Sequence, residues 1–218
     1  MRAFGSRLLR RHGKEAFVHS LPKSARLLDV GCGNNSPLRI KSQRPDIAYT
    51  GIDIGDLYQP IDPSLHADRY ILTTKDGFAG EIGKMAGQFD AVLSAANLEH
   101  CIEPEAVLAA ILGALAPKGR LYLSFPTEAS VNFPRRAGCL NFFDDKTHLQ
   151  LPKFDDVLAA IARADCAVSY AARRYRPLLL ATAGLLLEPI SAAMKRTIPG
   201  GTTWALYGFE SVIWAEKR

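Results

Sequence analysis

The sequence lacks closely spaced cysteines. Its four cysteines, Cys32, Cys101, Cys139 and Cys166, lie far apart among 218 residues. Structural zinc sites and disulfide scaffolds need cysteines at short, recurring spacings. We therefore expect no metal site and no disulfide framework, and a protein of a reducing compartment.

Long apolar runs are also missing. The longest, Leu178 to Leu187, is interrupted by Thr182 and followed by Glu188-Pro189. A membrane-spanning helix needs about 20 apolar residues, so this run is too short to span. The arginine-rich first 20 residues contain no continuous apolar core of the secretory kind. We expect a cytoplasmic location, either free in the cytoplasm or associated with the cytoplasmic face of a membrane.

Neither disorder nor low complexity is indicated. Hydrophobic residues make up 48% and charged residues 22% of the chain, which is typical of globular proteins and excludes a largely disordered chain. The length fits one domain over residues 1–218. Within it we expect an N-terminal helix in 1–22 and an apolar helical insertion in 177–201.

Positive charge is concentrated near the chain ends. The net charge is +5, and residues 163–196 contain six Lys or Arg against two Asp or Glu. A basic segment favours an anionic partner, such as nucleic acid or an anionic membrane.

Short apolar runs alternate with helical patterns. The runs predict strands at 26–30, 47–54, 69–74, 89–94, 120–125, 166–176 and 203–217, and the helical spacing predicts helices at 3–19, 104–115 and 154–164. This alternation indicates an α/β fold with a doubly wound, mostly parallel sheet. The connection 126–152 has no clear periodicity, and long irregular connections are often functional.

A glycine turn follows the first predicted strand. Gly31 and Gly33 flank Cys32, and such a turn brings backbone N–H groups close to a ligand. A dinucleotide fingerprint would have a third glycine where Ser36 stands, which disfavours a nicotinamide oxidoreductase. Asp29 ends the first strand, where it can face an ammonium group. Asp53 ends the second, where a carboxylate can bind both hydroxyls of a ribose.

Four ordered motifs resemble one known family. Residues 27–33 (LLDVGCG), 51–54 (GIDI), 89–100 (FDAVLSAANLEH) and 116–121 (APKGRL) resemble motifs of the class I S-adenosylmethionine-dependent methyltransferases, in particular a small-molecule "type 11-like" subgroup. The resemblance spans residues 26–126. It implies a Rossmann-like seven-stranded sheet with an antiparallel last strand, preceded here by the helical insertion.

The resemblance also implies a binding site for S-adenosylmethionine. The Gly31–Gly33 turn, including Cys32, would pass the methionine part of the cofactor, whose amino group would lie near Asp29. Asp53 would bind the ribose, and Ile54 would lie against the adenine. The remaining pocket positions implied are Asp76, at the adenine amino group, and Ser94 and Ala95, at the end of the fourth strand.

Acceptor binding is expected beyond the fourth and fifth strands. His148 is the first candidate general base because its pKa normally lies near working pH. Asp145 would orient it or bind substrate hydroxyls, and His100 is a further base or pocket wall. Local roles remain open for all three, since Asp and Thr also satisfy turn backbone. The Arg135–Arg136 pair either grips an anion or is solvated.

The segment 178–194 allows two interpretations. Its apolar run lies between Arg173, Arg174 and Arg176 on one side and Lys195-Arg196 on the other. One interpretation is an interfacial helix that contacts an anionic membrane. The other is a buried packing helix, a lid or a dimer contact.

The leading functional hypothesis is methyl transfer to a small molecule. Its expected acceptor is a hydroxyl of a sugar, a glycan precursor or a lipid-linked intermediate. We expect no DNA partner. Methylation of RNA is an alternative, disfavoured by the lack of an Asn-Pro-Pro-aromatic stretch after the fourth strand. A non-catalytic protein that binds S-adenosylmethionine as a scaffold is a further alternative.

Overall fold

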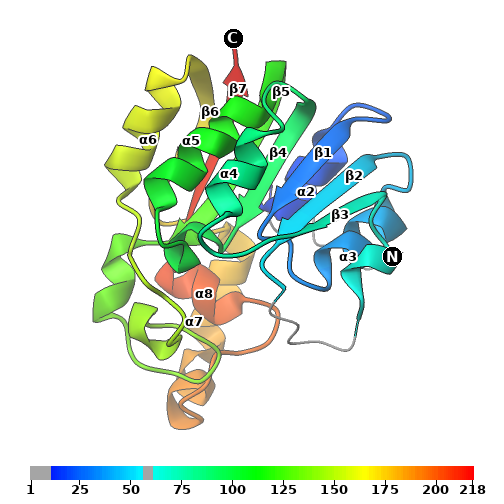
Figure 1. Ribbon diagram of the computed structural model, residues 1–218. Coiled ribbons are helices and arrows are strands. Elements are labelled where there is room, and N and C mark those ends of the chain that lie inside the picture. Colours follow the sequence, from blue (N-terminus) through cyan, green and yellow to red (C-terminus); the bar gives the residue numbers. More distant parts are fainter. Residues whose placement is uncertain (1–10, 56–60) are drawn as a thin grey trace.

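The computed structural model describes residues 11–55 and 61–218, which contain one seven-stranded sheet with helices on both faces (Figure 1). The strands are β1 (Arg26–Val30), β2 (Ala48–Asp53), β3 (Arg69–Leu72), β4 (Phe89–Ala95), β5 (Leu115–Pro126), β6 (Cys166–Ala172) and β7 (Glu210–Lys217). Their order across the sheet is β3-β2-β1-β4-β5-β7-β6.

The direction of the strands confirms the predicted fold class. Strands β1 to β5 pair in parallel, and β7 runs antiparallel to both β5 and β6. The chain starts in the middle of the sheet at β1, moves outward to β3 and returns to β4 beside β1. Ligands of such sheets bind where this reversal occurs, beyond the carboxyl ends of the strands.

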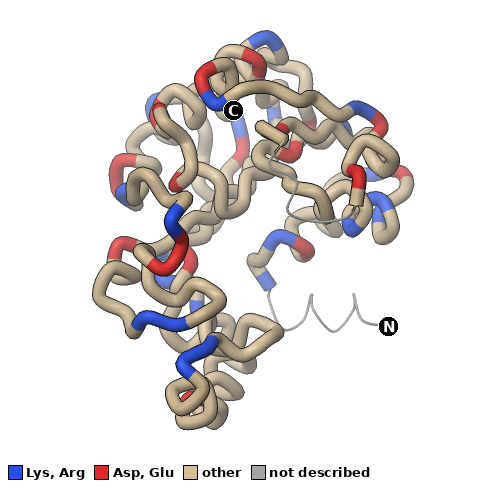
Figure 2. The backbone as a smooth tube through the Cα atoms, turned by 60° about the horizontal axis from the view of Figure 1, so that its bottom comes forward, with Lys and Arg blue, Asp and Glu red and all other residues tan. Residues whose placement is uncertain are grey.

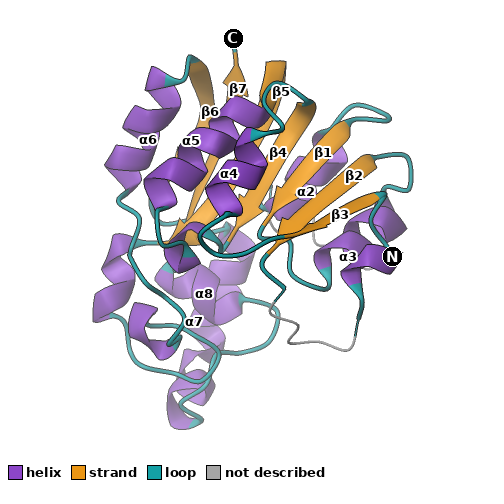
Figure 3. Ribbon diagram, in the orientation of Figure 1, coloured by secondary structure: helices purple, strands orange, loops and turns teal. Residues whose placement is uncertain are grey.

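Helices cover the two faces in separate groups (Figure 3). One group is α2 (Lys14–Ser20) and α3 (Ser36–Gln43), and the other is α4 (Phe78–Gly83), α5 (Pro104–Ala114) and α6 (Phe154–Arg163). Short 3-10 turns lie at η1 (Pro63–Leu65), η2 (Leu98–His100), η3 (Glu128–Asn132) and η4 (Phe142–Asp144). Two further helices, α7 (Leu178–Ala193) and α8 (Thr202–Tyr207), form the insertion between β6 and β7.

The strand sequences are continuous apolar runs because both faces of the sheet are buried. In β1, Leu28 and Val30 belong to the core under α4, α5 and α6, whereas Leu27 belongs to the core under α2 and α3. Helix α5 starts with Pro104 in its first turn, where a missing N–H costs nothing. Helix α6 has Asp155 and Asp156 in its first turn, where negative charge is favoured.

Two predicted elements differ from the structure. The strand predicted over 203–217 begins only at Glu210, because 202–207 form α8, which is followed by Gly208 at φ +60°. A glycine in this left-handed conformation commonly ends a helix, whereas the Thr and aromatic residues of this stretch favour a strand. Of the helix predicted over 3–19, residues 3–10 lie outside the described part, and the described helix is Lys14–Ser20.

The insertion packs its smallest residues inward. Gly184 of α7 lies so close to α8 that a Cβ atom there would be 2.3 Å from the carbonyl oxygen of Thr202. Most large apolar residues of α7 are exposed instead, and Leu178 and Leu186 are 78% and 80% exposed. In the part of the chain that the structure describes, no helix is both long and apolar enough to cross a bilayer.

A pair of glycine substitutions tests this packing. We expect Gly184→Ala to lower the free energy of unfolding by about 1–3 kcal/mol, because the added methyl group meets backbone atoms of α8. The matched control is Gly113→Ala in α5, where a Cβ atom would meet nothing within 4 Å. The control should gain about 0.5 kcal/mol from reduced chain entropy. Urea denaturation measures both, and an unchanged Gly184→Ala protein would contradict the α7–α8 contact.

Candidate active site

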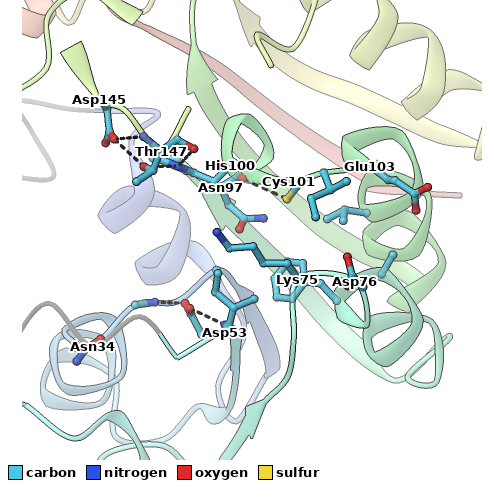
Figure 4. Close-up of a pocket in the computed structure, with 18 residues that line it drawn as sticks. Asn34, Asp53, Lys75, Asp76, Asn97, His100, Cys101, Glu103, Asp145 and Thr147 are labelled. Atoms are coloured by element: carbon cyan, nitrogen blue, oxygen red, sulfur yellow. Dashed lines mark hydrogen bonds between the residues drawn. The ribbon is translucent and has the colours of Figure 1, made fainter. Parts of the chain in front are cut away.

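The carboxyl ends of β1, β2 and β4 surround a cavity of about 680 Å³ (Figure 4). This volume lies within the roughly 300–1,000 Å³ of small-molecule sites. Several residues predicted from the sequence share its wall, namely Gly31, Gly33, Asp53, Ile54, Asp76, His100 and Asp145. Others do not line it, namely Asp29, Cys32, Ser94, Ala95 and His148.

The turn after β1 requires glycine for two reasons. Gly31 has a φ of +69°, which side chains disfavour, and a Cβ atom there would lie 2.3 Å from Oδ1 of Asn97. Its N–H donates to the carbonyl oxygen of Ile52 at 3.0 Å. The turn is therefore drawn against the end of β2 and lies directly under the segment that follows β4.

Asp53 is held rigidly at the cavity wall. Its Oδ2 accepts from the Gly33 N–H at 2.7 Å and its Oδ1 accepts from the Ile54 N–H at 2.8 Å. Each carboxylate oxygen can accept more than one hydrogen bond. The side chain is thus fixed in place by backbone donors and keeps acceptor capacity for a ligand.

Asp29 lies beneath the cavity, in a buried network. Its Oδ2 accepts from Ser36 Oγ at 2.5 Å and from the Tyr49 hydroxyl at 2.8 Å, and Lys14 Nζ lies 3.5 Å away. Its Oδ1 is buried without a hydrogen-bond partner. Burial and the neighbouring Asp29 charge raise the pKa of Tyr49, so this phenol remains a donor. The network joins β1 to α2, α3 and β2.

The other predicted residues outside the wall support it from behind. The thiol of Cys32 is buried in the core beside Tyr49, and burial raises its pKa. Ser94 is buried at the end of β4, and its Oγ accepts from Nδ2 of Asn97 at 3.2 Å. Ala95 is half-buried next to it. Their side chains position the wall rather than form it.

A hydrogen-bonded group forms the opposite end of the cavity. Asp145 Oδ1 accepts from the Thr147 N–H at 2.8 Å and from its hydroxyl at 2.6 Å. Nδ1 of His100 lies 3.2 Å from the Thr147 carbonyl oxygen and 3.0 Å from its hydroxyl oxygen. Burial, followed by the nearby His148, lowers the pKa of His100, so its ring is neutral at pH 7. Burial acts to raise the pKa of Asp145, but the hydrogen bonds from Thr147 outweigh it and lower this pKa.

His148 lies behind His100, with the ring centroids 4.8 Å apart. Its Nδ1 is 2.6 Å from the carbonyl oxygen of Phe142, and its Nε2 is 4.0 Å from Oδ2 of Asp145. Beside the two rings is Glu99, which is 1% exposed. Burial raises the pKa of Glu99 to about 8, and its Oε2 has no hydrogen-bond partner.

Among the wall residues that sequence reasoning did not identify, three bear directly on the shape and chemistry of the cavity. Lys75 extends across the cavity between Asp53 and Asn97 (Figure 4). Asn97 closes over Gly31, and Thr147 connects Asp145 to His100. Lys75 stands directly before the predicted Asp76, so its position gave a weak signal, whereas no spacing in the sequence links Thr147 to His100.

The predicted arginine pair is split between two roles. Arg136 is buried, and its guanidinium donates to both carboxylate oxygens of Glu188, at 2.9 and 2.6 Å, and to Ser191 Oγ at 2.6 Å. Its charge is therefore used to bind α7. Arg135 is exposed and lies over the ring of Phe143.

The buried position of Asp29 leads to a stability prediction. We expect Asp29→Asn to lower the free energy of unfolding by about 2 kcal/mol, because two hydroxyl donors and Lys14 lose a charged acceptor. The matched control Asp156→Asn, at an exposed position of α6, should change it by less than about 0.5 kcal/mol. Urea denaturation measures both. Unchanged stability in Asp29→Asn would show that this network does not hold the fold.

Comparison with known proteins identifies the family. A profile of the family described as methyltransferase domain matches residues 1–170. A ubiquinone biosynthesis O-methyltransferase from Xanthomonas axonopodis pv. citri is 33% identical over 109 residues, which cover 47% of this chain and 44% of that protein. One from Pseudomonas aeruginosa (strain LESB58) is 33% identical over 106 residues, covering 45% and 43%. The aligned part thus spans less than half the length of these curated relatives.

Solved structures share the fold at low sequence identity. An S-adenosylmethionine-dependent methyltransferase from Mesorhizobium loti has a TM-score of 0.62 and 14% identity, covering 94% of this chain and 97% of that one. The [4+2]-cyclase SpnF has a TM-score of 0.59 and 20% identity, covering 99% and 80%. With the profile matching most of its length, the chain belongs to the methyltransferase domain family, that is, to the class I S-adenosylmethionine-dependent methyltransferases.

Proposed function

We propose that this protein transfers a methyl group from S-adenosylmethionine to a hydroxyl group of a small molecule. The observation that carries the proposal is a single cavity with two different ends. Asp53 and the glycine turn form one end, and His100, Asp145 and Thr147 form the other. A methyl donor and an acceptor bound at these two ends would meet inside one cavity.

The residues at the first end fit the cofactor. The fixed Asp53 carboxylate has the acceptor capacity for ribose hydroxyls, and the apolar Ile54 follows it in the wall. At Gly33, where φ is +57° and a Cβ atom would meet nothing within 4 Å, the turn leaves space for the methionine part, and Lys75 supplies a positive charge for its carboxylate. Asp76 lines the same region, where it suits the adenine amino group.

The second end has the groups that an acceptor hydroxyl needs. When bound, S-adenosylmethionine supplies an electrophilic methyl group, and its carbon–sulfur bond breaks with the electron pair passing to sulfur. The acceptor oxygen forms the new bond and loses its proton. Nε2 of the neutral His100 and Oδ2 of Asp145 are the proton acceptors at this wall. Enclosure and orientation supply most of the remaining rate enhancement.

The cavity wall and the relatives both support one class of acceptor. Phe78, Ile102 and Val107 give the cavity an apolar surface between its polar ends. Two relatives are named as O-methyltransferases of ubiquinone biosynthesis. Both observations favour a hydroxyl on a lipid-linked or otherwise partly apolar molecule over a free sugar or a glycan precursor.

Binding and transfer can be measured separately. We expect Asp53→Ala to weaken S-adenosylmethionine binding in calorimetry by about tenfold or more, because each lost charged hydrogen bond contributes about 1.5–3 kcal/mol. The matched control Asp156→Ala removes the same charge from an exposed position of α6 and should bind as the unaltered protein does.

Transfer is tested by mass spectrometry with hydroxylated aromatic, glycosyl and prenylated acceptors. We expect methylated product and S-adenosylhomocysteine in equal amounts. Cofactor binding without any methylated acceptor in the panel would contradict hydroxyl methylation, and absence of cofactor binding would contradict the proposal as a whole.

A further inference from the structure

Three metal-ligating side chains meet behind the acceptor end of the cavity. Glu99 and His100 come from η2, and His148 comes from the connection between β5 and α6. One ligand atom from each lies within 4.8 Å of the others. His148 stands 48 positions after His100 in the sequence, yet the three side chains converge beside a cavity wall that includes His100.

Both imidazoles direct their lone pair away from the backbone. Nδ1 of His148 faces the Phe142 carbonyl oxygen, and Nδ1 of His100 faces that of Thr147. Because a carbonyl oxygen only accepts, each Nδ1 carries the proton and each Nε2 is free to ligate. Metal-bound histidines are typically held in this way, by a hydrogen bond from the second ring nitrogen.

Glu99 is an independent observation that points to a ligand. Its carboxylate is almost fully buried, yet Oε2 has no hydrogen-bond partner. A buried polar atom without a partner is costly and rare, and where one occurs a bound ion often satisfies it. A cation between Glu99 and the two rings would satisfy this oxygen.

We propose that Glu99, His100 and His148 bind one divalent transition-metal ion. Two imidazoles and a carboxylate suit Zn²⁺ and similar ions, and three protein ligands leave a position open. The three ligand atoms lie within 4.8 Å of one another, whereas ligands of a tetrahedral zinc ion are roughly 3.4 Å apart, so small side-chain movements would complete the site.

The role of this ion rests on the proposed function. The open position would take the acceptor hydroxyl oxygen and lower the pKa of the hydroxyl, as metal ions do for bound water. His100 is then a ligand, and Asp145 takes the proton, since its Oδ2 lies 4.0 Å from Nε2 of His148.

Metal binding is measured on the full chain without cofactor or acceptor. The chelator-treated protein is titrated with Co²⁺ and followed by visible absorption and calorimetry. We expect one ion per chain, no thiolate band in the near ultraviolet, and about tenfold or greater loss of affinity in Glu99→Gln and in His148→Ala. The matched control Glu103→Gln removes a carboxylate from the same wall outside the cluster and should bind normally.

Other results would overturn the metal site. These are absence of Co²⁺ binding, a thiolate band, or equal affinity in the variants. Thermal melting monitors folding, and His100→Ala, at a less buried position, replaces any variant that does not fold. If the unaltered protein binds Co²⁺ but not S-adenosylmethionine, that result would contradict only the proposed function.

A second inference concerns the outward face of α7. Six large apolar residues of this segment are more than half exposed, namely Leu178, Leu179, Leu185, Leu186, Ile190 and Met194. Among the residues of α7 itself, only Gly184 and Ser191 are buried. A helix that served as an internal packing element would show the reverse pattern.

Contacts on its inner side fix the orientation of α7. Gly184 lies against the α8 backbone, and the buried Arg136 holds both Glu188 and Ser191 from the opposite side. Rotation of α7 to bury its leucines would leave the buried guanidinium of Arg136 without its partner, which is strongly unfavourable. The apolar face is therefore a stable feature of the surface.

Positive charge flanks the apolar face. Arg174 and Arg176 precede α7, and Lys195 and Arg196 follow it, whereas Glu188, the single acid of the helix, is paired with Arg136. Figure 2 shows Lys and Arg segments beside this end of the molecule. In Figure 1, α7 and α8 lie beyond the carboxyl ends of the strands, on the side of the sheet where the cavity opens.

We infer that the α7 face binds the surface of an anionic lipid bilayer. Apolar side chains would enter the interface, and the flanking cations would meet lipid phosphates. The length of α7, Leu178–Ala193, is too short for a span, so the helix would lie in the plane of the membrane.

Vesicle sedimentation tests this surface. We expect the unaltered protein to bind vesicles of phosphatidylcholine and phosphatidylglycerol, less so in high salt, and only weakly those of phosphatidylcholine alone. The double variant Leu185→Ser/Leu186→Ser should bind about tenfold less or weaker still. The matched control Leu65→Ser/Leu72→Ser removes exposed leucines elsewhere and should bind normally.

Equal binding by both double variants, or no binding by the unaltered protein, would overturn the inference. A dimer in light scattering that only the α7 variant abolishes would assign this face to a second copy of the chain. Neither vesicle binding nor dimer formation depends on cofactor binding, so these experiments test the α7 face separately from the proposed function.

Discussion

The parallel pairing of β1 with both of its neighbours is the constraint on which the site depends. Val30, the last residue of β1, lies opposite Ile52 on one side and Ser94 on the other. Because the three strands point the same way, the residues that follow them emerge at one edge of the sheet. A slip of one residue in either pairing would turn core side chains to the wrong face. The two apolar cores therefore hold the cavity in register.

Burial gives the two acids of the predicted cofactor site different environments. Asp53 is fixed by two backbone donors at the cavity wall and keeps acceptor capacity. Asp29 contacts Ser36, Tyr49 and Lys14 beneath the wall. Both stand within two residues of a strand end beside the same glycine turn, so sequence spacing alone does not separate them. Both side chains lie on the same face of the sheet, because Asp29 pairs with Gly51 and Asp53 follows Gly51 by two residues. They differ because Asp53 lies beyond the last β1–β2 pair, Val30 with Ile52, at the edge of the sheet where the cavity lies.

Local patterns were sufficient for most of the sheet and for part of the first end of the cavity. The apolar run at 26–30 coincides with β1, and the glycine turn and Asp53 line the predicted pocket. The acceptor end depends on contacts between distant segments. Glu99 and His148 converge only because the 126–152 connection folds back over η2, where the Leu149 N–H donates to the Glu99 carbonyl oxygen. No periodicity records such a contact, and cysteine spacing, on which the expectation of no metal site rests, carries no information about this cluster.

The fold does not determine the reaction, since a [4+2]-cyclase shares it with methyltransferases. Specificity must therefore come from segments added beyond the sheet. Here two such segments, the 126–152 connection and α7, are joined by hydrogen bonds. Asp144 accepts three backbone N–H groups from Arg136, Leu140 and Asn141, and Arg136 in turn binds Glu188 of α7. The acceptor wall and the exposed face of α7 therefore form one unit. If that face rests on a membrane, as proposed, the same contacts hold Asp145 and His148 at a fixed depth beneath it, and a lipid-linked hydroxyl reaches the cavity without leaving the bilayer surface.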